Sequence, residues 1–347
     1  MNNYFIIATF CIVVLLAVGI LTRRRVNAAG IHPGIETKHK TRVKPVFSGS
    51  FIQYWMAESW GYDRWINEMT MLKDIGIEEI ILQEVADTKV KYAVYPTRLT
   101  GFKYNGTDMV GTALKAADSL GMKVRIGLGF NDQWWIKNAF SKRWLNVEAE
   151  INRAIVKEIA KIYGSYKSFK GWYIPHEFYQ LTALTKAQQR HLNSFLKEIT
   201  SEIKDNSTKD IMIAPFYHGK LSFLCPLSTW SKRIKNILMG TGIDIVALQD
   251  SIGTGYNKLK LLDRLFSYTK KSTDALGMKL YSDVETFAVK SSKHFPAAQD
   301  RISEQISIAS KYVEGFVAFS ISHYQNRNAD EREGNYKDYY AYYLANK

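Results

Sequence analysis

From residue 47 onward, short apolar runs alternate with longer amphipathic stretches. The runs are rich in β-branched and aromatic residues, and some, such as Ile80-Ile81-Leu82, have no polar position at all. Strands that are covered on both faces have this continuous apolar pattern. The pattern predicts eight buried strands, at residues 47–54, 78–83, 123–129, 171–175, 211–217, 243–249, 279–283 and 315–320.

Segments with helical periodicity separate these runs, and four are clear, at residues 60–74, 108–120, 148–163 and 186–204. Gly76 and Gly121 follow two of them, where a glycine favours the end of a helix. The phrases DIGIEEIILQ, SLGMKVRIGLG and ALGMKLYSDVE share one order: helix end, glycine, apolar residue, strand. Eight β/α units in about 300 residues predict a (β/α)8 TIM barrel, an α/β fold, over residues 47–347. An open doubly wound sheet is the alternative, but FSGSFIQYW is not the glycine-rich phosphate loop that such a sheet usually carries after its first strand.

The first 46 residues differ from the rest. Residues 4–21 form an apolar stretch of 18 residues without formal charge, and Arg23-Arg24-Arg25 follow at once. Such a stretch can just span a bilayer, so residues 1–25 are predicted to be a membrane anchor or signal segment and residues 26–46 a basic tether. An uncleaved anchor is favoured over cleavage near Ala28-Ala29-Gly30, which would secrete the protein. The arginines favour a cytoplasmic domain, but large domains translocate despite flanking charge, and we expect a cell-membrane protein with an extracellular domain.

Charge and cysteine content exclude several classes of function. The net charge is +14, and residues 1–46 carry seven Lys or Arg against one acid, which places +6 in the tail and +8 in the domain. A basic tail beside an apolar stretch is typical of a membrane anchor, so we expect no nucleic-acid partner. The two cysteines, Cys11 and Cys225, suggest neither a disulfide framework nor a metal cluster. We expect a monomer that needs no cofactor.

Active sites of (β/α)8 barrels lie at the carboxyl ends of the strands. The residues that follow the predicted strands are polar and aromatic, which suits a carbohydrate. Two glutamates stand out: Glu177 ends the fourth strand in GWYIPHE, and Glu285 ends the seventh in KLYSDVE. These strands lie on opposite sides of an eight-stranded barrel, so both carboxyl groups can face across its mouth. Retaining glycosidases place two such groups about 5–5.5 Å apart, as nucleophile and as acid/base.

Other residues offer rival chemistry. Glu84, Asp250 and Asp283 are further acids near strand ends. His176, His218 and His323 could supply a zinc or iron site, although no two of them have the close spacing of a helical zinc motif.

On these residues the sequence resembles the large clan of retaining (β/α)8 glycosidases that includes the family 5 cellulases. FSGSFIQYW, GWYIPHE and GFVAFSISHYQ resemble more specifically a group of bacterial glycosidases, some of which accompany exopolysaccharide synthases such as cellulose synthases. The resemblance covers residues 47–347 and implies that Glu177 is the proton donor and Glu285 the nucleophile. The clan usually has Asn before the acid/base, at the position of His176. Its strand-8 tryptophan and strand-2 arginine are not evident here.

The resemblance thus implies an endo-β-1,4-glucanase that acts on a cellulose-like exopolysaccharide, with a polysaccharide synthase as a candidate partner. The side chains predicted to bind the substrate are His176, Tyr217, His218, Trp55, Trp134, Trp135, Gln249 and Tyr324. Trp172 is a further candidate for stacking on a sugar, and Tyr217 for holding the nucleophile. Two alternatives remain open: a barrel that binds a polysaccharide or a synthase without cleaving it, and a metal-dependent polysaccharide deacetylase.

Overall fold

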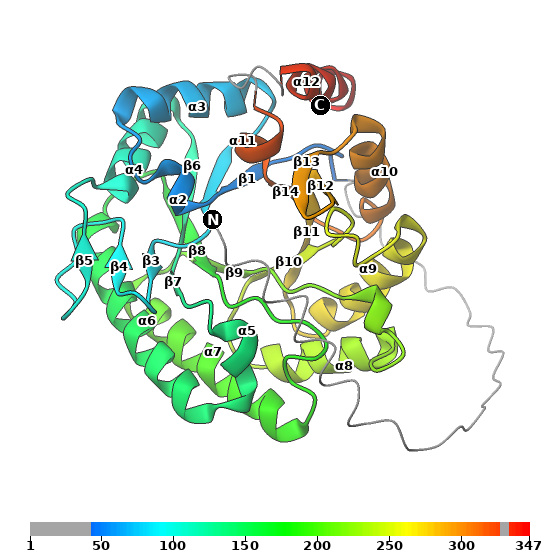
Figure 1. Cartoon of the computed structure of the whole chain (residues 1–347), viewed down its shortest axis with the longest axis horizontal. Helices are drawn as coiled ribbons and strands as arrows, with labels where there is room; N and C mark the ends of the chain where they lie inside the picture. The colour runs from blue at the N-terminus through cyan, green and yellow to red at the C-terminus, as the bar shows by residue number, and fades with distance from the viewer. Residues whose placement is uncertain (1–42, 327–332) are drawn as a thin grey trace. The chain divides into compact units, whose positions relative to one another are not determined.

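Eight parallel strands close into a barrel in the computed structural model of the protein, which describes residues 43–326 and 333–347 (Figure 1). All eight predicted strands are confirmed. Around the barrel they follow the order β1 (Gly49–Ile52), β14 (Gly315–Phe319), β11 (Lys279–Glu285), β10 (Ile245–Gln249), β9 (Asp210–Ile213), β8 (Phe169–Ile174), β6 (Lys123–Gly127) and β2 (Glu79–Leu82).

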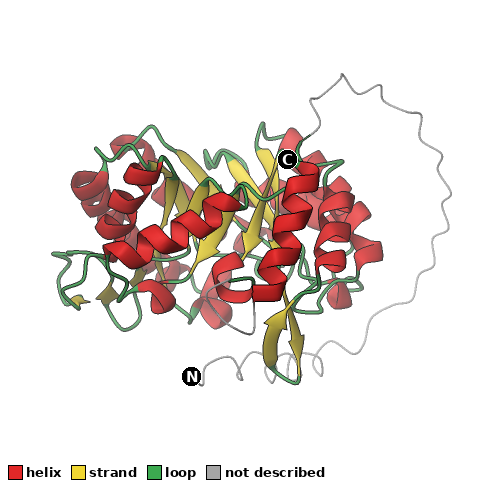
Figure 2. Ribbon diagram, turned by 90° about the horizontal axis from the view of Figure 1, so that it is seen from above, coloured by secondary structure: helices red, strands yellow, loops and turns green. Residues whose placement is uncertain are grey.

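Helices surround the barrel and cover the outer face of the strands (Figure 2). The long ones are α3 (Tyr62–Asp74), α4 (Met109–Leu120), α6 (Lys142–Tyr163), α7 (Lys186–Asn206), α8 (Leu227–Leu238), α9 (Leu259–Asp274), α10 (Gln299–Ala309) and α12 (Glu333–Asn346). Local signals explain their ends: Asp108 accepts a hydrogen bond from Gly111 N at the start of α4, and Gly121, with φ 67°, closes it. Short helices lie in the loops: α2 (Tyr54–Ala57), α5 (Trp134–Lys137), η2 (Asn138–Phe140), η3 (Gly219–Leu221) and α11 (Ile321–Tyr324).

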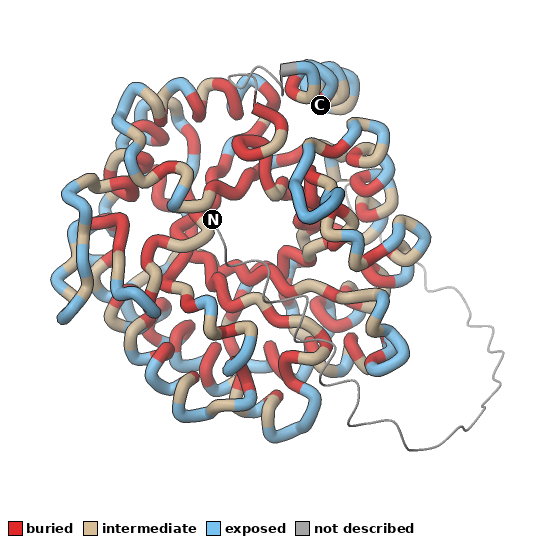
Figure 3. Tube along the Cα trace, in the orientation of Figure 1, coloured by how far each residue is buried: buried red, intermediate tan, exposed pale blue. Residues whose placement is uncertain are grey.

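The inside of the barrel is a core of its own, separate from the larger core between strands and helices. It contains alternate strand residues: Phe51, Ile81, Tyr173, Met212, Ala214, Ile245, Ala247 and Val317, with Tyr281 and Phe319 packed against them. Below these, at the amino ends of the strands, buried Arg125 pairs with Glu79 and Asp210 at 2.8 Å each. Buried segments line the barrel wall in Figure 3, and the outer loops are exposed. The polar side chains Gln249 and Glu285, which end β10 and β11, lie at the carboxyl end of the barrel, above this apolar core.

Two small sheets were not predicted. One combines β5 (Lys103–Tyr104), β4 (Tyr92–Ala93), β3 (Ala86–Asp87) and β7 (Gly129–Phe130) in that order. The other is a hairpin of β12 (Phe287–Lys290) and β13 (Lys293–Pro296), which begins two residues after Glu285 and projects from the barrel in Figure 2. Their strands are too short for periodicity to reveal them.

The predicted membrane segment, residues 4–21, lies outside the described residues. Within residues 43–326 and 333–347, no helix is both long and apolar enough to cross a membrane.

Candidate functional site

Glu177 lies at the mouth of the barrel, held from below and from the side. Tyr173, one of the inward residues of β8, donates its hydroxyl to Glu177 Oε1 at 3.1 Å, and the amides of Gln249 and Gln83 also bond the carboxyl group. Burial raises the pKa of Glu177 to about 7, although these three hydrogen bonds lower it. Trp134 donates its indole N–H to the backbone oxygen of Glu177 at 2.6 Å, which fixes the chain just after β8.

Glu285 ends β11, three positions from β8 around the barrel. Its carboxyl group accepts the backbone N–H of Thr254 at 2.7 Å and lies 3.3 Å from the Thr254 hydroxyl. Arg301 donates to the backbone oxygen of Glu285 at 2.6 Å. Burial, and next the charge of Asp250, raise the pKa of Glu285 to about 8. Neither Thr254 nor Arg301 was a sequence candidate, because neither lies at a strand end.

Gly253 passes directly beside Glu285 and leaves no room for a side chain. A Cβ there would collide with the backbone oxygen of Phe287 and come within 3.0 Å of the Glu285 Cβ. We expect Gly253→Ala to lower the free energy of unfolding by about 1–3 kcal/mol, the usual cost of overpacking, as measured by urea denaturation. Gly61→Ala is the control, since nothing lies within 4 Å of a Cβ at that position. Equal stability of the two variants would contradict this account of the turn.

A row of aromatic rings lies on the Glu177 side of the mouth. Tyr179 stacks on Phe216 with centroids 4.9 Å apart, and Tyr256 stacks on His218 at 3.9 Å. Trp135 and Tyr256 each contact Phe216, at 6.1 and 6.2 Å. All five rings are partly exposed. The predicted candidates Trp135 and His218 therefore belong to one surface, which we name the Glu177-side row.

A second row, the Glu285-side row, begins two residues after Glu285. Phe287 contacts Tyr324 and His294, both at 5.0 Å, and Tyr324 contacts His323 at 5.9 Å. Trp55 meets His323 edge-on at 5.2 Å and is 55% exposed. The predicted candidates Trp55 and Tyr324 thus lie together on the opposite side of the site.

Four of the side chains predicted to contact the substrate are buried in the structure. His176 is fully buried among Phe130, Trp134 and Phe195, so its ring cannot reach a ligand at the mouth. Burial lowers the pKa of His176 to about 3.

Tyr217 is also buried and donates its hydroxyl to the backbone oxygen of Cys225 at 2.8 Å, so it holds a loop and not a carboxylate. Trp134 is fully buried, and its role is the hydrogen bond to the backbone of Glu177. Trp172 is likewise buried, between β8 and the helices, with its indole N–H on Ser207.

The three histidines considered as metal ligands lie in separate surroundings. His176 packs in the core, His218 on Tyr256, and His323 beside Trp55. In the part of the chain that the structure describes, no three His, Cys, Asp or Glu side chains are arranged to hold a metal ion.

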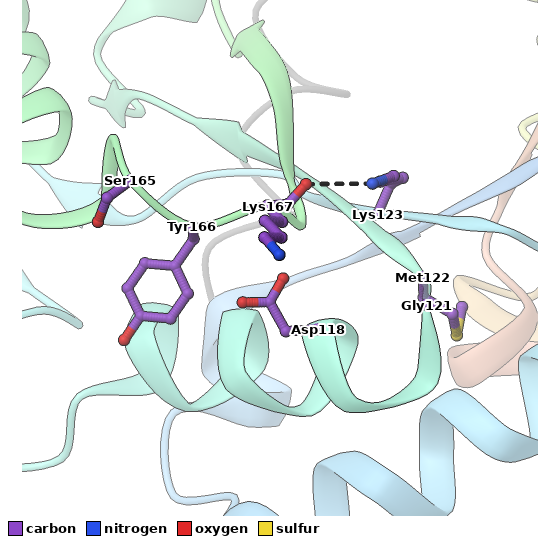
Figure 4. A pocket seen from close by; sticks show the side chains of 7 residues that line it. All are labelled: Asp118, Gly121, Met122, Lys123, Ser165, Tyr166 and Lys167. Atoms are coloured by element: carbon purple, nitrogen blue, oxygen red, sulfur yellow. Dashed lines mark hydrogen bonds between the residues drawn. The ribbon is translucent and has the colours of Figure 1, made fainter.

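A cavity of about 590 Å³ lies away from these side chains, at the opposite end of the barrel. It is lined by Asp118, Gly121, Met122, Lys123, Ser165, Tyr166 and Lys167, between the end of α4 and the starts of β6 and β8 (Figure 4). Lys123 donates to the Lys167 backbone oxygen at 3.1 Å, and Asp118 accepts the Ser168 N–H at 2.6 Å. These polar groups of the cavity lining thus hold the end of α4 and the starts of β6 and β8 together, which is a structural role. The candidate functional site is therefore the one at the mouth.

A family model described as "Domain of unknown function (DUF4434)" matches residues 47–330, most of the chain. The chain belongs to the DUF4434 family. No curated protein matches it in sequence.

Solved structures resemble this DUF4434 domain. A "putative alpha-L-fucosidase" from Bacteroides thetaiotaomicron VPI-5482 matches with a TM-score of 0.73 and 23% identity, over 93% of this chain and 100% of that chain. The endo-1,4-beta-D-mannanase from Thermotoga petrophila RKU-1 has a TM-score of 0.56 and 14% identity, over 79% and 88%. The endo-1,4-beta-mannanase from Rhizomucor miehei has a TM-score of 0.53 and 12% identity, over 84% and 95%. At these identities the likeness establishes the TIM-barrel fold, which these named glycosidases share.

Proposed function

We propose that the DUF4434 domain is a retaining glycoside hydrolase, with Glu177 as acid/base and Glu285 as nucleophile. The observation that carries the proposal is the pair itself: two glutamates at the ends of β8 and β11 in one barrel mouth, each with a pKa raised by burial. Groups that titrate near neutrality can exchange protons with a bound molecule at physiological pH.

The reaction is a double displacement. A Glu285 carboxylate oxygen attacks the anomeric carbon, the glycosidic C–O bond breaks, and the Glu177 proton goes to the leaving oxygen. In the second step Glu177 takes a proton from water, the water oxygen attacks the anomeric carbon, and the bond to Glu285 breaks. Both glutamates return to their first state, and no cofactor takes part.

Catalysis requires a proton on Glu177 and none on Glu285. The pKa values of about 7 for Glu177 and about 8 for Glu285 place the proton on Glu285 in most molecules between those pH values, so the reactive state, with the proton on Glu177, is a minor one whose population is greatest there. We therefore expect kcat/KM to be greatest between pH 7 and 8. The rate falls below this range because Glu285 becomes protonated in more molecules, and above it because Glu177 loses its proton.

The direction of the bound sugar chain follows from these roles. Glu285 bonds to the sugar that keeps the anomeric carbon, so this sugar lies toward the Glu285-side row. Glu177 protonates the leaving oxygen, so the leaving part lies toward the Glu177-side row. Aromatic rings offer flat faces to sugars on both sides, which supports a long chain cut internally, as in an endo-β-1,4-glucanase.

Trp135→Ala should separate these two halves of the substrate. It removes a ring on which the leaving sugars stack, so kcat/KM for an oligosaccharide should fall about 10-fold, while an aryl glycoside without leaving sugars should be hydrolysed at the wild-type rate. Trp55→Ala is the matched control and should lower kcat/KM for both substrates. Equal losses on both substrates in Trp135→Ala would refute the proposed direction.

The cellular setting is part of the proposal. An N-terminal anchor would hold the domain outside the cell membrane, where a cellulose-like exopolysaccharide emerges from its synthase. Fractionation of cells that carry the full chain tests this location, and a domain found in the cytoplasm would contradict it.

The decisive experiment incubates the protein with cellulose, mixed-linkage glucan, xylan and mannan and measures reducing ends and product lengths. Anomeric configuration, followed by proton NMR during the first minutes, should be that of the substrate. No release from any of these polysaccharides, or release with inversion, would overturn the proposed reaction.

A further inference from the structure

Five carboxyl groups act on one another at the mouth: Glu84, Glu177, Asp250, Asp283 and Glu285. Arg301 is a cation whose charge acts on two of them, Asp250 and Glu285. Like charges this close in a buried site cannot all ionise, so some of these groups keep a proton at neutral pH.

Hydrogen-bond donors are shared unequally among these groups. Asp250 receives the N–H of Ile252 at 3.1 Å, the N–H of Glu285 at 3.4 Å and the amide of Gln305. Glu285 receives both donors of Thr254, and Glu177 the Tyr173 hydroxyl. Because hydrogen-bond donors stabilise the ionised form, each of these three carboxyl groups has some compensation for carrying a negative charge in the protein interior.

Asp283 differs from them. It is 1% exposed, and in the described part of the chain no group bonds its Oδ1 atom. Parity along β11 turns it inward, between Tyr281 in the barrel core and Glu285 at the mouth, and its register neighbours are Gln249 and Val317.

Asp283 also interacts with most of the group. Its electrostatic neighbours are Glu177, Asp250 and Glu285, so it lies within reach of both proposed catalytic glutamates. A buried carboxylate with three acidic neighbours and an oxygen without a donor would be strongly unfavourable.

We propose that Asp283 is a positioning residue that keeps its proton at neutral pH, so that the carboxyl group buried near both Glu177 and Glu285 is neutral. Its catalytic part rests on the proposed function. A charge on Asp283 would oppose ionisation of both glutamates. Without that charge, Glu285 can become a carboxylate while Glu177 holds the proton that the leaving oxygen receives.

The charged and titratable neighbours agree with this assignment. Glu84 follows β2, Tyr173 and Glu177 come from β8, Asp250 follows β10, and Arg301 lies on α10. Arg301 acts on Asp250 and Glu285, whereas the charges that act on Asp283 are those of three acids: Glu177, Asp250 and Glu285. Burial, and then these three acids, raise the pKa of Asp283 well above its ordinary value.

The test follows the carboxyl carbon of Asp283 by NMR in protein labelled with ¹³C at aspartate, with Asp283→Asn to assign the signal. Asp283 should remain protonated throughout the range from pH 7 to 8. In Glu285→Gln, which removes a neighbouring charge, it should ionise at a pH roughly one unit lower than in the wild type. A purely structural aspartate would not respond to Glu285→Gln. Titration near the ordinary value of about 4 would overturn the proposal.

The pH dependence of kcat/KM gives the second readout. Asp283→Asn replaces a neutral acid by a neutral amide of the same shape, so both limbs of the profile should stay in place. If Asp283 were ionised, the same change would move both limbs to lower pH, by roughly one unit. Asp283→Ser repeats the comparison if the Asn variant does not fold, and exposed Asp300→Asn is the control. The NMR titration needs no substrate, so it separates failure of this inference from failure of the proposed hydrolase.

Discussion

Glu285→Gln is expected to lower kcat/KM for polysaccharide hydrolysis by roughly 10⁴-fold or more, because an amide does not form the bond to the anomeric carbon. The fold should survive the change. The Gln oxygen can still accept the Thr254 N–H, and Arg301 bonds the backbone of residue 285 and not its side chain. Steady-state kinetics and thermal unfolding together measure the two effects.

Added azide identifies the role of Glu285 more directly. In Glu285→Ala the removed carboxyl group leaves space beside the anomeric carbon, and azide should displace an aryl leaving group there in one step. One displacement gives a glycosyl azide of inverted configuration. Glu78→Gln, an exposed change next to the amino end of β2, should leave activity intact. Wild-type activity in Glu285→Gln would remove it as the nucleophile and direct attention to Asp283 or Glu84.

The fold was predictable because a buried parallel strand leaves a strong signal. Each barrel strand is covered on both faces, so the runs are apolar throughout, and β/α repetition then allowed little besides a TIM barrel. The β12–β13 hairpin left no such signal. Its four-residue strands are mostly exposed, and Ser291 and Ser292 form its turn at φ 46° and 62°, where Asn-Gly would be the usual sign.

The sequence misplaced His176 and Tyr217 because alternate residues along a strand point to opposite faces, and this alternation was not followed past the strand ends. Along the β9 segment, Met212 and Ala214 face the barrel axis, so Phe216 continues toward the mouth and Tyr217 turns outward into the core. The same alternation places Tyr173 beneath Glu177 and turns His176 away. Counting in twos from Glu177 would have found Tyr173 and rejected His176.

Other partners could not be found this way. Thr254 and Arg301 reach Glu285 from a loop and from a helix that are far from it in sequence, and only the closed barrel brings them near. Trp134 similarly comes from the loop after β6 to hold the backbone of Glu177. These contacts depend on loop conformation, which period-2 and period-3.6 patterns do not specify.

Glu177→Gln should show a different defect from Glu285→Gln. Loss of the proton donor should lower kcat/KM for a polysaccharide, whose leaving oxygen needs a proton, by about 10²–10⁴-fold. For an aryl glycoside with a good leaving group, the rate of the first step, in which Glu285 attacks the anomeric carbon, should fall much less. Its rate should rise with pH through about 8, where Glu285 ionises, and then stay level, because no Glu177 remains to lose its proton. The wild type should instead lose activity at high pH.

Azide also distinguishes Glu177 from Glu285. In Glu177→Ala the nucleophile is intact, so azide should attack the covalent sugar in the second step and give a glycosyl azide of retained configuration. Two displacements retain the configuration and one inverts it, so the pair of alanine variants assigns each glutamate its role independently of rate. If Glu177→Ala gave the inverted azide, or if Glu177→Gln kept the falling limb of the wild-type pH profile, then Glu177 would not be the proton donor. Glu84, whose pKa burial and the charge of Glu177 raise to about 8, would then be the next residue to substitute.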